Sequence, residues 1–384
     1  MRSVCEDLGM KFVGIHSAKM HDLTKPYERR RLHLFAEDFF TSIEGGLEFP
    51  RLSAALPGTV PEGLPGNPPA QTRHVYQPVS PVRPADTHGR RVVILTDALA
   101  CVQTGARSDA RPDLQRGQEN LLAMTARLNA AFGGNARVVN LHDIDIKGGC
   151  QGCLRCGAAY KCAYTGKDEF IDFYNTVLVP ADIIVFAGAI VARQLSWKWR
   201  EFFDRSFFNT HTPSLVGKQF AFVVAGPLSL LPEFRETYEA WTELQQSNLV
   251  TFISDEAGTG VGGPDVLAVA LDQLAERLVR LAEAAYIRPH TFLGVAGMKI
   301  FRDDIWSELR VVFRADHSSY KRLGFYDFPQ RRIGHRVLMG LAWFITGLPG
   351  IRSKFPSMIR TQMIVPIHRA AMKDAAQSRG EVMV

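Results

Sequence analysis

The sequence lacks any uninterrupted run of about 18 apolar residues, so we expect no membrane-spanning helix. The first residues, MRSVCEDLGMKF, contain no apolar signal-peptide core, so we expect no secretory signal and a cytoplasmic protein. The chain also lacks a strong excess of charge of either sign. It has 45 Lys and Arg and 39 Asp and Glu, which gives a net charge of +6. This mild excess predicts no nucleic-acid binding and is compatible with an anionic cofactor.

Cysteine is scarce but concentrated. The chain has six, and four of them fall within thirteen residues, at Cys150, Cys153, Cys156 and Cys162. In a chain without an export signal, such clustering favours a metal over disulfides. The remaining two cysteines, at positions 5 and 101, are expected to behave as small apolar residues.

The chain divides into four parts by composition. Residues 1–51 are mixed and partly helical in pattern, and residues 52–90 carry eight prolines with little apolar periodicity. The second part is therefore predicted to be a linker or an extended segment that wraps the next domain. Residues 91–290 alternate strand-like with helix-like patterns, and residues 291–384 form a basic, partly apolar extension.

The alternation in residues 91–290 predicts an α/β domain with a parallel sheet and helices on both faces. Five strands in about 200 residues favour a flavodoxin-like, doubly wound sheet of order 2-1-3-4-5, flanked by N-terminal and C-terminal extensions. Another strand order is the alternative. The expected strands are 91–96, 136–141, 182–187, 220–225 and 249–253, and the expected helices are 116–132, 167–178, 196–206, 233–246 and 264–286.

The cysteine spacing is C-x2-C-x2-C-x5-C, with nearby glycines that allow the backbone to wrap around a small object. Three cysteines at two-residue intervals with a close fourth favour a [4Fe–4S] cluster. Tetrahedral zinc and unligated thiols, with a redox disulfide, are the alternatives. Because the motif follows the second strand, we expect it at the carboxyl edge of the sheet, where doubly wound folds bind their ligands.

Several segments together resemble a known family. The cysteine motif is followed by KDEF at 167–170 and PADIIVF at 180–186, and SWKWREFFDR occupies 196–205. This pattern resembles the iron–sulfur flavoproteins of the NADPH-dependent FMN reductase superfamily, with Lys198, Phe202, Asp204 and Arg205 at matching positions. The resemblance covers about 91–290 and implies bound FMN, a [4Fe–4S] cluster, NAD(P)H as donor and a homo-oligomer. We interpret Asp204 and Arg205 as a helix-end ion pair that supports the fold.

Flavin contacts are expected after the first, third and fourth strands, where backbone N–H groups and hydroxyls can hold a phosphate. The loop after the first strand is longer than the family pattern, and the third loop has Ala189-Ile190-Val191 where the family has an S-P-V-Y-like segment. His142, near the cysteine loop, is expected either to tune the properties of the cluster or to be a solvated loop histidine. The candidate cofactor-binding residues are Thr96, Thr104, Arg107, Ser108, Gly188, Ala189, Ile190, Val191 and Gly226.

The two ends of the chain show a weak internal similarity. Residues 12–51 align with 292–330 at a shift of 280 and then 279, which suggests a diverged duplication; chance is the alternative. Residues 337–351 are apolar and flanked by basic residues, so they either pack against protein or make peripheral contact with a membrane.

These observations predict an oxidoreductase that transfers electrons through FMN and a [4Fe–4S] cluster to a redox partner protein or a small-molecule acceptor. The catalytic residues are not identified by the sequence, because the flavin itself carries the hydride chemistry. The alternative is a non-catalytic iron–sulfur redox sensor or scaffold that has lost flavin, since two of the flavin loops depart from the family pattern.

Overall fold

The structure is a computed structural model. It describes residues 2–8, 10, 12–17, 24–46, 75–99, 112–258, 263–328, 332–352, 361, 365–366 and 369. The chain forms two units, Met1–Tyr320 and Lys321–Val384.

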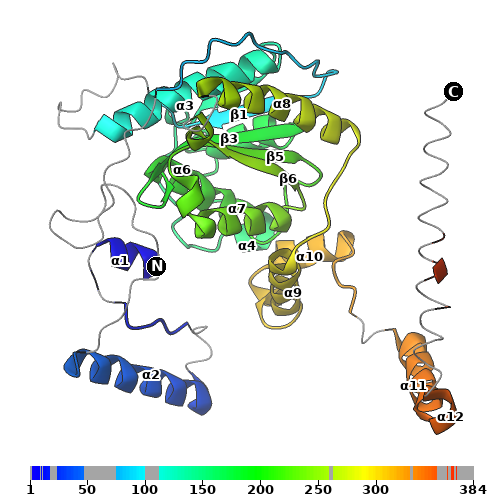
Figure 1. Ribbon diagram of the computed structural model, residues 1–384. Helices are drawn as coiled ribbons and strands as arrows, with labels where there is room; N and C mark the ends of the chain where they lie inside the picture. The colour runs from blue at the N-terminus through cyan, green and yellow to red at the C-terminus, as the bar shows by residue number, and fades with distance from the viewer. Residues whose placement is uncertain are drawn as a thin grey trace. The chain divides into compact units, whose positions relative to one another are not determined.

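Five parallel strands form the centre of the first unit (Figure 1). They are β1 (Val92–Thr96), β2 (Arg137–Asn140), β3 (Ile183–Val191), β5 (Gln219–Ala225) and β6 (Asn248–Ser254). Their order in the sheet is β2-β1-β3-β5-β6, which is the flavodoxin-like order predicted from the sequence. The fold class is therefore confirmed. Residues of β1, β3 and β5 are buried almost throughout, as expected for strands covered on both faces.

The third strand is longer than the sequence predicted. The apolar pattern placed its end at position 187 and a loop over 188–194, but Gly188 and Ala189 continue the parallel pairing with β5. Ala192 and Arg193 both have positive φ, 46° and 70°, and form a tight turn. The chain then returns as β4 (Gln194–Leu195), a short antiparallel strand that was not predicted.

Helices cover both faces of the sheet. In Figure 1, α3 (Pro112–Ala131) and α8 (Pro264–Glu283) lie above it, and α6 (Trp197–Ser206) and α7 (Pro232–Leu244) lie below it. Each pair of helices buries an apolar side against its own face of the sheet. The helical parts within and after the cysteine loop are short, namely α4 (Cys156–Ala159), α5 (Phe170–Phe173) and a π-helical turn, Tyr174–Leu178.

Residues 75–90, the described part of the proline-rich segment, pass over α3 and α8. Arg127 of α3 donates hydrogen bonds to the carbonyls of Ser80 and Pro81 and to the carboxylate of Asp272 on α8. The Arg127–Asp272 ion pair, at 2.7 Å, is buried. This part of the chain is therefore fixed to both helices, through the Arg127 guanidinium and through side chains that accept from its backbone N–H groups, namely Asn120 on α3 and Asp265 and Asp272 on α8. Residues 52–74 lie outside the described residues.

The N-terminal part contains α1 (Arg2–Asp7) and α2 (Pro26–Glu44). Asp7 pairs with the guanidinium of Arg193 in the turn after β3, at 2.6 Å. Phe12–Ser17 has no regular structure, whereas its proposed duplicate begins α9 (Phe292–Trp306). The described backbones of the two segments thus differ, and the duplication remains a hypothesis from sequence.

The C-terminal part is divided between the two units. α9 lies against α7, where Gly294 and Gly297 approach Glu243 and Leu244, and α10 (Arg314–Arg322) follows it. The second unit contains α11 (Ile333–Gly347) and α12 (Pro349–Arg352). Within the described part of the chain, every helix is too short or too polar to cross a membrane.

Candidate functional site

The four cysteines of the motif line one small cavity. Cys150, Cys153, Cys156 and Cys162 share it with residues from the end of α6 and the turn after it. Cys156 is buried, Cys162 is partly buried, and Cys150 and Cys153 are exposed. The sequence prediction that these four side chains come together is thus supported by their common cavity.

The loop that carries the cysteines is wound tightly. Gly152, Leu154 and Tyr160 have left-handed backbone conformations, with φ of 63°, 58° and 55°. Gly157 is needed for close approach, because a Cβ there would lie 2.6 Å from the carbonyl oxygen of Val312. The loop is therefore shaped by its own turns and by contact with the chain just before α10.

Arg205 at the end of α6 is the charged group of this cavity. It donates to both carboxylate oxygens of Asp168, at 2.6 and 3.1 Å, and to the carbonyl of Gly148 at 3.0 Å. Its guanidinium lies 4.1 Å from the ring centroid of Tyr164, in a cation–π contact. Among the described residues, nothing accepts the remaining Nε–H, although it is buried.

The carboxylate of Asp168 is held in its charged form by these contacts. Burial raises the pKa of Asp168, but the hydrogen bonds from Arg205 and from the backbone N–H of Lys147 outweigh it, and the pKa is lowered. The predicted pair of Asp204 with Arg205 is wrong. Asp204 lies 3.5 Å from Arg200 in a mostly exposed contact, because adjacent helical residues point in different directions.

The arrangement of the cysteines bears on which metal they could hold. No three His, Cys, Asp or Glu side chains in the described part of the chain come close enough to hold a single ion. A tetrahedral zinc ion requires sulfur atoms about 3.8 Å apart, and the described side chains do not present such a set. The case for a cubane cluster rests on the number and spacing of the cysteines, which are the donors such a cluster uses.

Two further properties bear on a cluster. The cavity has a volume of about 30 Å³, so the exposed part of the loop, residues 150–154, would have to move outward to admit four irons. Burial raises the pKa of Cys156, and the nearby Cys150, Cys162 and Cys153 raise it further. A bound cation would reverse this shift, because cysteine binds metal as the thiolate. The buried Nε–H of Arg205 also fits an anionic group.

The cavity does not lie where the sequence placed it. Ser196, the N-cap of α6, neighbours Asp97 at the carboxyl end of β1. The cysteine cavity is lined by Arg205, Phe207 and Phe208, at the opposite end of this ten-residue helix, about 15 Å further along. The prediction of cysteines at the carboxyl edge of the sheet is therefore wrong, because the loop runs back along α6 after leaving β2.

The predicted flavin residues after β3 and β5 are closely packed. Gly188 faces Trp199, whose Nε1 would lie 2.6 Å from a Cβ at this position. Gly226 likewise faces Ile190, and Thr96, Ala189 and Ile190 are buried. Of the described candidates only Val191, 40% exposed, reaches the surface. The expected phosphate contacts Thr104, Arg107 and Ser108 lie outside the described residues.

Two buried carboxylates at the same edge were missed by the sequence analysis. Burial raises the pKa of Asp97, against the lowering influence of Ser196 and Trp199, and its Oδ1 has no hydrogen-bond partner among the described residues. Asp255 accepts hydrogen bonds from the side chain of Asn120 and from the backbone N–H of Gly226. Both follow strands directly, which is the sequence signal that identifies them. His142 is partly exposed, with its ring 6.0 Å from that of Trp197.

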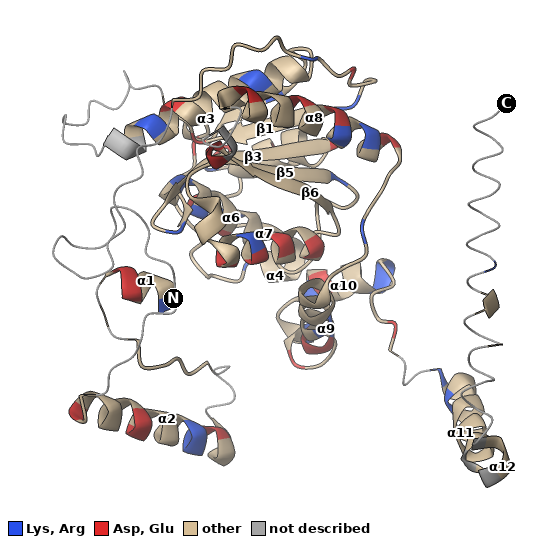
Figure 2. Cartoon of the chain, viewed as in Figure 1, with Lys and Arg blue, Asp and Glu red and all other residues tan. Residues whose placement is uncertain are grey.

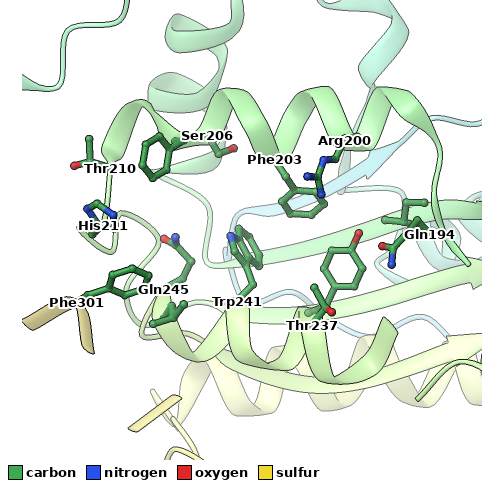
Figure 3. A pocket seen from close by; sticks show the side chains of 14 residues that line it. Gln194, Arg200, Phe203, Ser206, Thr210, His211, Thr237, Trp241, Gln245 and Phe301 are labelled. Atoms are coloured by element: carbon green, nitrogen blue, oxygen red, sulfur yellow. The ribbon is translucent and has the colours of Figure 1, made fainter. Parts of the chain in front are cut away.

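A larger cavity lies between α6 and α7, with a volume of about 570 Å³ (Figure 3). Figure 3 shows Phe203 on one helix and Trp241 on the other pointing into it, with His211 and Phe301 at one end and Gln194 at the other. Phe207 lines both this cavity and the cysteine cavity. The sequence analysis missed this site, because only the packing of the two helices creates it.

The chain matches no family model and no curated protein, but it is similar to several solved structures. Solved structures similar to it include RosB with bound 8-demethyl-8-formylriboflavin-5'-phosphate (15% identity, TM-score 0.34), covering 56% of this chain and 87% of that one. An azoreductase from Bacillus anthracis str. Sterne gives 15% identity and TM-score 0.34 over 49% and 99% of the two chains. The apo form of an NADH:FMN oxidoreductase (EMOB) gives 12% and 0.32 over 50% and 89%. At these values the similarity carries no conclusion about activity.

Proposed function

We propose that the protein is an oxidoreductase that holds a [4Fe–4S] cluster through Cys150, Cys153, Cys156 and Cys162 and binds FMN at the carboxyl edge of its sheet. The observation that carries the proposal is the common cavity of the four cysteines, next to the buried guanidinium of Arg205, whose Nε–H meets no acceptor within the described part of the chain. Thiolate-ligated clusters are anionic, so a buried cation beside them stabilises the bound form.

The flavin half of the proposal rests on the fold. In a doubly wound sheet, ligands bind at the order reversal, which lies here between β1 and β3. When bound, FMN and the cluster would exchange a hydride for single electrons, with NAD(P)H as the proposed donor. The protein's own contribution at this edge is the pair of buried carboxylates, Asp97 and Asp255, and the backbone of the turn at Gly226.

A second function is favoured by a different observation. Gly188, Ile190 and Gly226 pack against protein atoms, so they leave no slot for an isoalloxazine ring between them. The cysteine cavity also lies about one helix length from this edge. Both facts favour an iron–sulfur redox sensor that has lost flavin.

One preparation separates the candidates. The full chain is purified without oxygen, reconstituted with iron and sulfide, and analysed for iron, sulfide, zinc and FMN. The proposal expects about four irons and four sulfides per chain, together with one FMN. Iron without FMN supports the sensor, and zinc without iron supports the zinc alternative. Failure to bind iron after reconstitution contradicts both iron–sulfur functions.

The cysteines provide a matched control. Cys156→Ser removes a ligand and is expected to abolish iron binding, whereas Cys5→Ser, outside the motif in α1, should leave the iron content unchanged. Equal loss in both variants would show that iron binds to thiols non-specifically.

A further inference from the structure

The cavity between α6 and α7 has the size and lining of a small-molecule site. Its volume of about 570 Å³ falls in the range of ligand pockets. The Phe203 ring is 5.1 Å from Trp241 and 5.2 Å from Tyr238, so three aromatic rings from two helices form one wall. A rigid planar ring system packs well on such a wall, because it adds aromatic contacts at little conformational cost.

One end of the cavity carries fixed polar groups. The His211 ring lies between Phe207, Phe301 and Phe313, and its Nδ1 is 4.0 Å from Asp316. The carboxylate of Asp316 accepts from the backbone N–H of His211, which fixes this turn. At the same end, the Gln245 carboxamide oxygen accepts from the backbone N–H of Ser214, which leaves the amide NH2 group for a ligand.

We propose that this cavity binds a bicyclic quinone, with the fused rings on the aromatic wall and a carbonyl oxygen facing Gln245 and His211. FMN fits the lining less well. A flavin phosphate needs free N–H groups, such as those at a helix N-terminus. The lining residues of α6 begin at Arg200, whose backbone N–H already donates to the Ser196 carbonyl, and those of α7 begin at Thr237, beyond its first turn. Phe207 lines both this cavity and the cysteine cavity, so a bound quinone would lie close to the cysteines. It could then accept electrons from a cluster held there, and this role rests on the proposed function.

The test is to measure binding of 2,3-dimethoxy-1,4-naphthoquinone to the full chain by calorimetry. Both carbon atoms of its quinone ring that a thiol could add to carry methoxy groups. Thr237 is exposed at the cavity and Glu236 is exposed beside it on the same helix, outside the lining. Thr237→Phe fills the cavity and is expected to weaken binding about tenfold or more, whereas Glu236→Phe should change it less than about twofold. Gln245→Ala is expected to weaken binding without filling the cavity.

The outcomes are distinct. Absence of quinone binding, equal effects of the two phenylalanine substitutions, or displacement of the quinone by FMN would overturn the assignment. Iron is measured in the same samples. Quinone binding by protein that cannot take up iron would leave the cavity assignment standing and contradict the proposed cluster.

A second inference rests on the charge of the other unit. Residues 321–384 carry eleven Lys and Arg and three Asp and Glu, a net charge of +8. The whole chain is +6, so residues 1–320 carry −2. No acidic residue occurs between Asp327 and Asp374. The small positive charge of the whole chain is therefore the sum of a strongly basic second unit and a slightly acidic first unit.

The helix in this unit exposes large apolar side chains. Trp343 is 79% exposed, Val337 67% and Phe344 64%. In Figure 2, α11 is uncharged along most of its length. Arg332 and Arg336 lie at its start, and Arg352 follows in α12. Fifteen residues span about 22 Å, which is shorter than the hydrocarbon core of a bilayer.

We infer that α11 binds the surface of an anionic membrane, with its aromatic and aliphatic side chains in the interface and the flanking arginines at the headgroups. The combination of a short apolar helix with basic ends and no acidic residue matches the chemistry of interfacial binding. Arg332 also pairs with Asp327, in an exposed contact that lipid headgroups can compete with. Packing of α11 against a second copy of the chain is the rival, and it would not explain the excess of basic residues in this unit.

The test is co-sedimentation of the full chain with vesicles of phosphatidylcholine alone or mixed with phosphatidylglycerol. Binding is expected only with the anionic lipid and is expected to fall as salt is raised. Trp343→Glu is expected to reduce it about tenfold or more, whereas Phe40→Glu, a 60% exposed aromatic on α2, should not. The double variant Arg332→Gln, Arg336→Gln should bind the anionic vesicles more weakly than the wild-type chain does.

Two results would overturn this inference. One is equal binding to neutral and anionic vesicles. The other is a dimer in light scattering that Trp343→Glu converts to monomer, without binding of the wild-type chain to vesicles.

Discussion

Arg205 and Asp168 form a buried two-point ion pair between the end of α6 and the segment that follows the cysteine motif. The side chains are 1% and 0% exposed. The two residues belong to separate sequence patterns that carry the resemblance to iron–sulfur flavoproteins, and the structure brings them into direct contact. The pair thereby fixes one wall of the cysteine cavity.

Removing the charge of Asp168 is predicted to destabilise the protein strongly. Asp168→Asn leaves the Arg205 guanidinium buried without a counter-ion, which costs about 3–5 kcal/mol. Asp204→Asn, next to Arg205 in sequence but mostly exposed, should cost less than about 0.5 kcal/mol. Urea unfolding of metal-free protein measures both. Similar losses for the two variants would mean that Asp168 and Arg205 do not form a structural pair.

The cysteines are predicted to differ in reactivity. Burial raises the pKa of Cys156, so at a given pH a smaller fraction of this thiol is the reactive thiolate. In metal-free, reduced protein, we expect iodoacetamide to modify Cys156 about tenfold more slowly than the exposed Cys150 and Cys153. Its rate should keep rising with pH beyond the ordinary thiol range, because its pKa is raised. Mass spectrometry of timed samples gives the rates, and modification of Cys156 first would contradict the structure.

The ionised side chain of Asp97 is predicted to destabilise the folded protein at neutral pH. Its folded-state pKa is raised by burial, so the folded protein binds the proton more tightly than the unfolded chain does. The stabilising contribution of the protonated form is complete below the ordinary carboxyl pKa and is lost as pH rises through the raised one.

Asp97→Asn should therefore raise the melting temperature at pH 7 by about 2–4 °C, the shift that 1 kcal/mol produces in a domain of this size. The gain should shrink as pH falls towards the ordinary carboxyl range. Thermal unfolding at several pH values measures it, with Asp86→Asn, an exposed carboxylate, as the control. A gain that does not depend on pH would exclude ionisation of Asp97 as its cause.

Arg127 is predicted to hold residues 75–90 in place. Arg127→Met removes the hydrogen bonds to Ser80 and Pro81 and leaves Asp272 buried without its partner, at a cost of about 3–5 kcal/mol. Limited proteolysis should then cut this segment faster than in the wild-type chain. The surface pair of Lys299 with Asp303 serves as control, because Lys299→Met should leave the cleavage pattern unchanged.

The sheet was predictable because each strand has a strong local signal. β1 and β5 are continuous runs of apolar residues between polar helices, and their order follows from the connection rules for parallel sheets. The end of β3 was not predictable, since Gly188 and Ala189 are weak strand formers that only their pairing with β5 keeps extended.

The sequence alone determined the strand order, through local strand signals and the connection rules for parallel sheets. It also determined the gathering of the four cysteines, because these lie within thirteen residues of one another. Tertiary structure decided the rest. It chose Asp168 over Asp204 as the partner of Arg205, placed the cysteines at the far end of α6, and created the cavity between α6 and α7. Each of these depends on side chains that meet across elements far apart in sequence, and a local pattern carries no information about such contacts.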